Sequence, residues 1–317
     1  MALSSHVSAG DSSVTVVRLI LRILLIALAL LIFRYAACDS YSIKTVQMKP
    51  SVLPGDRLIV SRFAYAFPFK LAFRPRRGDV VIGNLHAGKD SLFCLRIVAL
   101  PGDTLSIHDG RFINNAYPDD AFRPKLSDTA TVVPMDYSLR DYMATLTLPH
   151  KGKRVLLDSL NIRDFCLTAG MIAMANPDRT YRIRARLFID GIEMPEYRIS
   201  AFALYRGAFD SIPASLSMNS FFWSRLLDFL RGKHEEKEVS LLLSLFEKDN
   251  LVITHTFRQS FIFLLADNWQ SGYDSRFFGP VNLSRIRGSA VSVLWSAYTD
   301  STGSRNIRFN RIGKFIS

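Results

Sequence analysis

Hydrophobic positions divide the chain into segments of different character. From residue 14 to residue 38 nearly every position is apolar, with an unbroken run over residues 23–33. After residue 39, short apolar runs alternate with turn residues, a pattern typical of β-strands joined by tight turns. Between residues 218 and 250 the apolar positions change to helical spacing. These patterns predict a mainly β fold with an N-terminal helix and a helical interlude.

The N-terminal segment is predicted to be a single membrane anchor over residues 14–38, after a short cytoplasmic tail over residues 1–13. Its unbroken apolar run covers only about 16 Å at about 1.5 Å per helical residue, roughly half the hydrocarbon thickness. The segment reaches spanning length when the preceding apolar residues are included. That requires three side chains to extend toward the membrane interfaces, those of Arg18, Arg22 and Arg34.

Other interpretations of this segment stay open. Ala36 and Cys38 are small residues placed as in a cleavable secretory signal peptide. Residues 35–38 read YAAC, which loosely resembles a lipoprotein attachment site at Cys38. A buried helix of a soluble protein is the remaining alternative. The charges do not determine how this segment would be oriented across a membrane, because arginine or lysine flanks both of its ends.

Hairpins are predicted in the strand-rich part of the chain. Residues 105–113 read LSIHDGRFI, in which Asp-Gly separates two apolar runs. Residues 181–191 alternate apolar residues with arginines before another Asp-Gly pair. Neighbouring residues of a strand point to opposite faces, so this alternation places three arginines on one solvated face. They are Arg182, Arg184 and Arg186. We expect an ordinary exposed strand face there rather than a specific anion site.

The interlude is predicted to contain helices around residues 219–248. Apolar residues recur at helical spacing in its first part, and again in its second part, at Leu241, Leu242 and Leu245. The charged residues 234–238 form a solvated linker between the two parts.

Composition and charge exclude several functional classes. Hydrophobic residues make up 49% of the 317 residues, so the chain can form a packed core. The net charge of +12 suits an anionic partner, either membrane lipid or nucleic acid. The 3 cysteines and 6 histidines show no metal-ligand spacing, and the cysteines are too few for a disulfide framework. No phosphate-binding glycine loop or nucleic-acid motif is present, so neither a cofactor, a metal nor nucleic acid is expected.

Four segments carry a resemblance to a known family. They read QMKPSVLPGD at residues 47–56, RGDVV at 77–81, FCLRIVALPGD at 93–103 and ADNWQSGYDSRFFG at 266–279. The last resembles the pattern Gly-Asp-Asn-Arg-x-Asn-Ser-x-Asp-Ser-Arg-Tyr/Phe-Trp/Phe-Gly. In order and spacing the segments resemble those of the type I signal peptidases. These are membrane-bound serine endopeptidases of family S26 that use a Ser–Lys dyad.

The resemblance implies a fold and a location. The expected fold is mainly β, with coiled antiparallel sheets formed by residues 39–113 and 250–317. A variable α+β insertion is expected over residues 114–249. One N-terminal transmembrane helix would make this a single-pass protein of the cytoplasmic membrane, with most of the chain on the extracytoplasmic side.

Many motif positions are retained, and we expect them to be structural. Several are turn glycines, and Asp274 with Arg276 matches a carboxylate–guanidinium pair that buttresses the family's site. The retained set is Met48, Pro50, Gly55, Asp56, Gly78, Asp79, Arg96, Pro101, Gly102, Asp103, Asp267, Asn268, Asp274, Ser275, Arg276 and Gly279.

The family's reactive positions hold other residues. The nucleophilic serine falls on Gln47, the lysine that takes its proton falls on Leu95, and a serine that orients the lysine falls on Gly272. A serine hydroxyl needs a base, and a lysine can be that base only when its pKa is lowered by burial. Since loss of such a nucleophile costs about 10⁶ in rate, we expect no catalytic residue at these positions.

Several functions follow from this pattern. The chain is expected to be a non-catalytic homologue that binds signal peptides of exported proteins, or a catalytically intact signal peptidase, through strand pairing. An active peptidase with relocated residues is an alternative, with candidates Ser42, Lys44, Lys49 and Ser51. A lipoprotein or secreted structural protein with the inherited fold is another.

Overall fold

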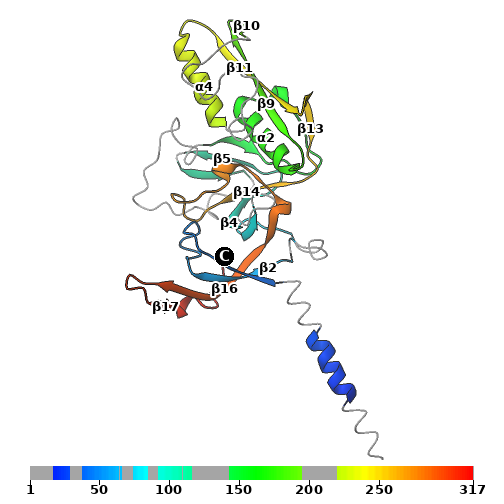
Figure 1. The fold of residues 1–317 in the computed structure, drawn as a ribbon, viewed down its shortest axis with the longest axis vertical. Coiled ribbons are helices and arrows are strands. Elements are labelled where there is room, and N and C mark those ends of the chain that lie inside the picture. The colour runs from blue at the N-terminus through cyan, green and yellow to red at the C-terminus, as the bar shows by residue number, and fades with distance from the viewer. Residues whose placement is uncertain are drawn as a thin grey trace, which may run out of the picture.

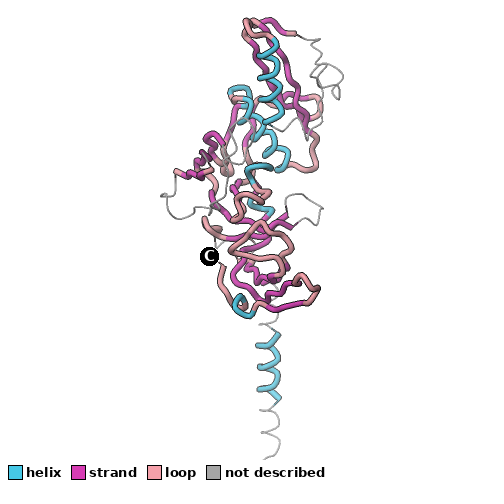
Figure 2. The backbone as a smooth tube through the Cα atoms, turned by 90° about the vertical axis from the view of Figure 1, so that its left-hand side faces the viewer, coloured by secondary structure: helices cyan, strands magenta, loops and turns pink. Residues whose placement is uncertain are grey.

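The structure is a computed structural model, and it describes residues 17–28, 38–63, 65, 74–84, 92–108, 110–115, 143–194 and 220–316. The molecule is elongated, with helical residues 17–28 at one end of its long axis (Figures 1 and 2). Among the described residues, no helix combines the length and the apolar character that a bilayer crossing requires. Much of the anchor predicted over residues 14–38 lies outside the described part of the chain.

The largest sheet is antiparallel throughout and joins segments that are far apart in the sequence. Its strands follow the order β1-β2-β16-β3-β4-β14-β15, and β17 pairs with β16. Each neighbouring pair is antiparallel, which together with the smaller sheets confirms the mainly β prediction. The strand bounds are β1 Cys38–Ser42, β2 Asp56–Ser61, β3 Val80–Asn84, β4 Leu92–Ala99, β14 Phe261–Leu265, β15 Val281–Asn282, β16 Ile286–Thr299 and β17 Arg305–Ile307.

Strands β4 and β14 form the centre of the core. All of β14 is buried, because its alternate residues enter different hydrophobic clusters. Ile262 and Leu264 pack with Leu95 in one cluster, while Phe263 and Leu265 pack in the other. A strand buried on both faces shows a continuous apolar run instead of alternation. The second cluster is completed by a small sheet of β5 (Thr104–His108), β6 (Arg111–Asn114) and β7 (Met143–Thr147).

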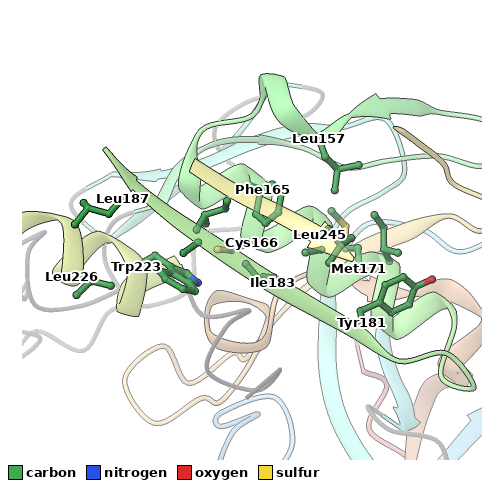
Figure 3. Close-up of a cluster of buried hydrophobic side chains, with 14 of the residues drawn as sticks. Leu157, Phe165, Cys166, Met171, Tyr181, Ile183, Leu187, Trp223, Leu226 and Leu245 are labelled. Atoms are coloured by element: carbon green, nitrogen blue, oxygen red, sulfur yellow. The ribbon is translucent and has the colours of Figure 1, made fainter. Parts of the chain in front are cut away.

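Most of the described part of the segment predicted as an insertion forms a separate sheet with two helices against it, whereas its strand β7 pairs with β5. The sheet has the order β10-β9-β11-β12, and a short pair, β8 and β13, lies beside it. Both helices contribute side chains to one cluster with the inward residues of β9 and β11, as Figure 3 shows for Phe165, Trp223 and Ile183. The bounds are β8 Arg154–Leu156, α2 Ile162–Ala175, β9 Tyr181–Ile189, β10 Ile192–Glu193, α4 Ser220–Lys233, β11 Val239–Glu247, β12 Asn250–Leu251 and β13 Thr254–Thr256.

Part of the predicted helical interlude is a strand. Residues 220–233 are helical, but Leu241, Leu242 and Leu245 lie in β11. The prediction of a second helix there is therefore wrong. The physical reason is tertiary: β11 pairs along its whole length with β9, and the alternating inward side chains of both strands are buried together. Leucine suits either structure, so the available partner strand decided the outcome.

Helix α2 was not predicted from the sequence, whereas both predicted hairpins are present. The side chain of Asn161 accepts a hydrogen bond from the Asp164 backbone N–H and caps α2, a local signal that was present in the sequence. Strands β5 and β6 pair across the first Asp-Gly turn, and β9 and β10 pair across the second. The boundaries of the insertion remain a prediction.

Gly55 offers a test of how closely β16 approaches the first motif. Its φ is +92°, and a Cβ added there would lie 1.7 Å from the Ala297 carbonyl oxygen of β16. Gly102 has nearly the same φ, +93°, with nothing within 4 Å of an added Cβ. We therefore expect Gly102→Ala to cost about 1 kcal/mol of unfolding free energy through backbone strain alone. Gly55→Ala should cost about 1–3 kcal/mol more, because the backbone of β16 must move. Urea unfolding of both variants measures the difference, and equal losses would contradict the close approach.

Candidate functional site

The structure brings the three departing positions together around one loop. Gln47 lies in the turn before β2, Leu95 lies in β4, and Gly272 lies in the loop that follows β14. The Asn268 backbone N–H donates to the Gln47 carbonyl oxygen at 2.9 Å. A Cβ on Gly272 would lie 3.0 Å from the Asn268 carbonyl oxygen. The loop over residues 266–274 is therefore held against the turn that contains Gln47.

Arg96 connects this loop to the other motifs. Its Nε donates to Asp267 Oδ1 at 2.8 Å, and its Nη2 donates to Asp267 Oδ2 at 2.6 Å. The Nη1 atom donates to the Gly78 carbonyl oxygen at 2.7 Å, and Nη2 also reaches Ser51 Oγ at 3.2 Å. Both side chains of the ion pair are nearly inaccessible to solvent, 4% exposed for arginine and 6% for aspartate. The guanidinium of Arg96, which itself belongs to the third motif segment, therefore bonds to one residue of each of the other three segments.

Leu95 fills an apolar position. Its side chain is fully buried, in the same cluster as Met48, Val52 and Ala266. Its neighbour Cys94 is no substitute nucleophile, because burial, and secondarily the charge of Asp267, raises the pKa of its thiol to about 12. At neutral pH the side chains at 94 and 95 thus provide neither a thiolate nor a base.

Ala266 and Gly272 both differ from the family pattern, the first by gaining a methyl group and the second by losing a side chain. The pattern has glycine where this chain has Ala266 and serine where it has Gly272. A Cβ built on Gly272 would lie 2.2 Å from the Ala266 Cβ and 3.2 Å from Asp274 Oδ2. The methyl group of Ala266 therefore occupies the space that a side chain at position 272 would need. The sequence analysis missed Ala266, although both changes were visible in the same segment.

Asp274 and Arg276 form the predicted buttress. Arg276 Nε donates to Asp274 Oδ1 at 2.8 Å and Nη2 donates to Oδ2 at 2.7 Å, with both side chains fully buried. Asp274 Oδ2 also accepts from the Ala266 backbone N–H at 3.0 Å, and the guanidinium lies 4.1 Å from the Trp269 ring centre. The short helix α5 (Ser275–Phe278) begins at this pair, with Asp274 as its cap. The two ends of the loop are thereby fastened together.

Asp56, another retained position, is paired with an arginine that the sequence analysis did not identify. Arg311 of η5 (Phe309–Arg311) donates from Nη2 to Asp56 Oδ2 at 2.6 Å, and Ser296 Oγ donates to Oδ1 at 2.6 Å. Burial by itself would raise the pKa of Asp56. Hydrogen bonds from Arg311, the Leu53 N–H and Ser296 outweigh it and hold the pKa below the usual value of 3.8.

The remaining retained positions close turns or fill the core. Asp103 accepts from Arg77 Nε at 2.8 Å, and its pKa is lowered because Arg77, the Leu100 N–H and Asn114 outweigh the effect of burial. Asp79 Oδ2 accepts from the Arg76 N–H at 2.9 Å. Ser275 Oγ accepts from the Leu264 N–H at 3.0 Å. Positive φ angles occur at turn glycines Gly78, Gly102 and Gly279, while Met48 is buried and Pro50 and Pro101 lie in turns.

The candidates for relocated catalysis are not arranged as a dyad. Ser42, Lys44 and Lys49 are exposed. The Ser51 hydroxyl contacts Arg96, and a guanidinium is a hydrogen-bond donor and not a base. For these described residues, no hydrogen bond joins either serine to either lysine.

Comparisons with known proteins agree with the resemblance. The sequence profile described as signal peptidase, peptidase S26, matches residues 16–295. Signal peptidase I of Aquifex aeolicus (strain VF5) is 21% identical over 282 residues, which cover 89% of this chain and 85% of that protein. Signal peptidase I V of Bacillus subtilis (strain 168) is 28% identical over 129 residues, covering 39% of this chain and 71% of that protein. Signal peptidase I of Buchnera aphidicola subsp. Baizongia pistaciae (strain Bp) is 34% identical over 89 residues, covering 26% and 28%.

The Asp56 cluster predicts a pH-dependent loss of stability. Because the folded-state pKa of Asp56 is lowered, its contribution is complete above the unfolded pKa of about 3.8 and is lost as pH falls toward the folded pKa. Asp56→Asn leaves Arg311 buried without its anion and should cost about 3 kcal/mol at pH 7. Ser296→Ala, the control, removes the hydroxyl that donates to Asp56 and accepts from Arg308 and should cost about 1–2 kcal/mol. Urea unfolding from pH 7 to pH 3 measures the gap between Asp56→Asn and the native chain, and a gap that does not shrink below about pH 3.8 contradicts the assignment.

Proposed function

Since the chain belongs to the family described as signal peptidase, peptidase S26, we propose that it is a non-catalytic member. It binds the signal peptides of exported proteins without cleaving them. The proposal rests on one observation: apolar groups occupy two of the positions where the family has its reactive side chains, while the buried ion pairs that hold those positions in place are present. Leu95 is fully buried among apolar side chains, and the Ala266 methyl group occupies the space beside Gly272. The ion pairs that hold these segments in place, Arg96–Asp267 and Asp274–Arg276, are present.

The chemistry at the site argues against hydrolysis. Acyl transfer by this family needs a hydroxyl and a base beside it. The amide of Gln47 supplies neither, and Leu95 has no titratable atom. The nearby Cys94 thiol is held protonated by burial, as its raised pKa indicates. Removal of one such nucleophile costs about 10⁶ in rate, and here the nucleophile and the base are absent together.

Peptide binding does not need the missing side chains. An extended peptide pairs with a strand through main-chain N–H and C=O groups, and these are independent of the residues at 47, 95 and 272. The strands and the loop around those positions are held by buried ion pairs and by the Asn268–Gln47 hydrogen bond. A rigid binding surface is therefore compatible with the loss of the reactive groups.

Cleavage and binding can be tested on one set of variants. We expect the purified chain to leave a precursor with an Ala-x-Ala site intact, while a signal-peptide mimic binds in calorimetry or crosslinking. Gln47→Ser with Leu95→Lys and Gly272→Ser should fold poorly, because a Cβ at 272 meets the Ala266 Cβ at 2.2 Å. Adding Ala266→Gly removes that clash, so this fourfold variant should be more stable than the threefold one and should gain measurable cleavage.

The controls separate the possible failures. Precursor cleavage by the native chain that is lost in Ser42→Ala or Ser51→Ala would establish relocated catalysis and overturn the proposal. Lack of cleavage together with lack of binding to the mimic would refute the peptide-binding part alone. Melting temperatures of all variants show whether a missing activity reflects misfolding.

The proposal also places the C-terminal face of the large sheet on a membrane. Strand β16, η5 and the C-terminal residues that follow expose Trp295, Tyr298, Phe309 and Phe315, the last two by 73% and 77%. Several exposed aromatic groups in one region of the chain are favoured at membrane interfaces. Strands β16 and β17 lie toward the end of the molecule that carries helical residues 17–28, whose apolar side chains are also exposed (Figure 1).

Tryptophan fluorescence provides a test of this contact. Of the 3 tryptophans, Trp223 and Trp269 are buried and Trp295 is 38% exposed. In vesicles with brominated lipid tails, we expect quenching of the full-length protein that disappears in Trp295→Phe. Phe309→Ser with Phe315→Ser should reduce the quenching, because the face then partitions less strongly into lipid. A spectrum that brominated lipid leaves unchanged would contradict a membrane contact at this face.

A further inference from the structure

The sheet of the insertion has one face covered by helices and one face that exposes three arginines. In β9 the inward residues Ile183, Ala185 and Leu187 pack in the cluster that contains α2 and α4. The alternate residues Arg182, Arg184 and Arg186 are exposed on the other face. Opposite them in the register of β11 lie Phe246, Ser244 and Leu242. We call the residues of this second face in β9 and β11 the arginine face.

Two of the three guanidinium groups of the arginine face lie over neighbouring rings. The Arg184 Cζ lies 4.4 Å from the Phe246 ring centre, and the Arg186 Cζ lies 5.6 Å from the Phe188 ring centre. Arg186 also contacts Glu193 of β10 at 3.5 Å, an exposed pair of small energy. A guanidinium stacked on a ring loses less freedom on binding, and the N–H groups along its edge stay available for a carboxylate.

Although the alternation in the sequence favours an ordinary exposed strand face, we propose that the arginine face binds an extended acidic segment of a partner protein. Alternate residues of a strand are about 6.6–6.8 Å apart on one face. A partner in the same extended conformation, with acidic residues at alternate positions, has the same spacing and presents one carboxylate to each arginine. The arginine face carries three arginines in β9 and the acidic Glu193 in β10. Its net positive charge is therefore complementary to an anionic partner.

Other anionic partners fit the arrangement less well. The insertion strands lie at the opposite end of the long axis from helical residues 17–28 (Figures 1 and 2). A bilayer contacted by those residues would therefore be remote from the arginine face. Single-stranded nucleic acid binds through aromatic rings that are free to stack on bases. Here Arg184 lies over the half-buried Phe246 ring.

The test compares peptides of equal composition. One probe is a 12-residue peptide in which glutamate alternates with threonine, and the other has the same residues with the glutamates in one block. We expect the full-length protein to bind the alternating peptide more tightly. Arg182→Gln with Arg184→Gln and Arg186→Gln should weaken that binding at least about tenfold, since three exposed ion pairs are lost. Lys151→Gln with Lys153→Gln and Lys237→Gln is the control, because it removes equal charge at exposed positions outside this face.

Each result bears on the proposal, which is independent of peptide cleavage or signal-peptide binding. Unchanged binding by the arginine variant, with an unchanged melting temperature, would overturn it. Equal affinity for both peptides would mean that only general charge attraction holds them, and it would also overturn the proposal. Tighter binding of single-stranded DNA or anionic vesicles, lost with the same three arginines, would assign this face to a different partner class.

Discussion

The buried Arg96–Asp267 ion pair is the interaction on which the architecture of the candidate site depends. Arg96 comes from a central strand, and Asp267 comes from the loop that follows the neighbouring strand. Desolvation of these two charges is expensive, and it is offset here by paired hydrogen bonds and by further acceptors on Gly78 and Ser51. Because breaking such a pair leaves a buried charge, segments distant in the sequence are restricted to one mutual arrangement. The positions that carry chemistry in this family are then fixed relative to one another, whatever residues occupy them.

This separation of scaffold from chemistry explains how a site of this kind can fold without the proposed reactive groups. A buried lysine is a liability in an apolar environment, and leucine fills the same kind of space without a desolvation cost. The change at Gly272 is coupled to Ala266 by direct steric contact, so neither position can be interpreted alone. The packing around Leu95, Ala266 and Gly272 indicates that these three residues are sterically compatible with one another.

The insertion contributes a second surface with different physical properties. Its helices cover one face of its sheet, which leaves the arginines of β9 on the other. The C-terminal face of the large sheet is instead rich in exposed aromatic groups. The two proposals therefore concern surfaces of different chemistry, one aromatic and one cationic.

The sequence by itself determined the family, the mainly β fold and the hairpins. These properties are local: Asp-Gly turns set hairpins, alternation sets strand faces, and motif order sets the alignment. Tertiary structure decided the rest. Residues 239–247 are a strand because β9 offers a partner, although leucines at helical spacing favoured a helix. Arg311 was not foreseen as the partner of Asp56, 255 residues away, because no local pattern encodes so distant a contact. The collision between Ala266 and a side chain at 272 likewise exists only after the loop has closed, since spacing along a sequence does not specify which atoms meet in space.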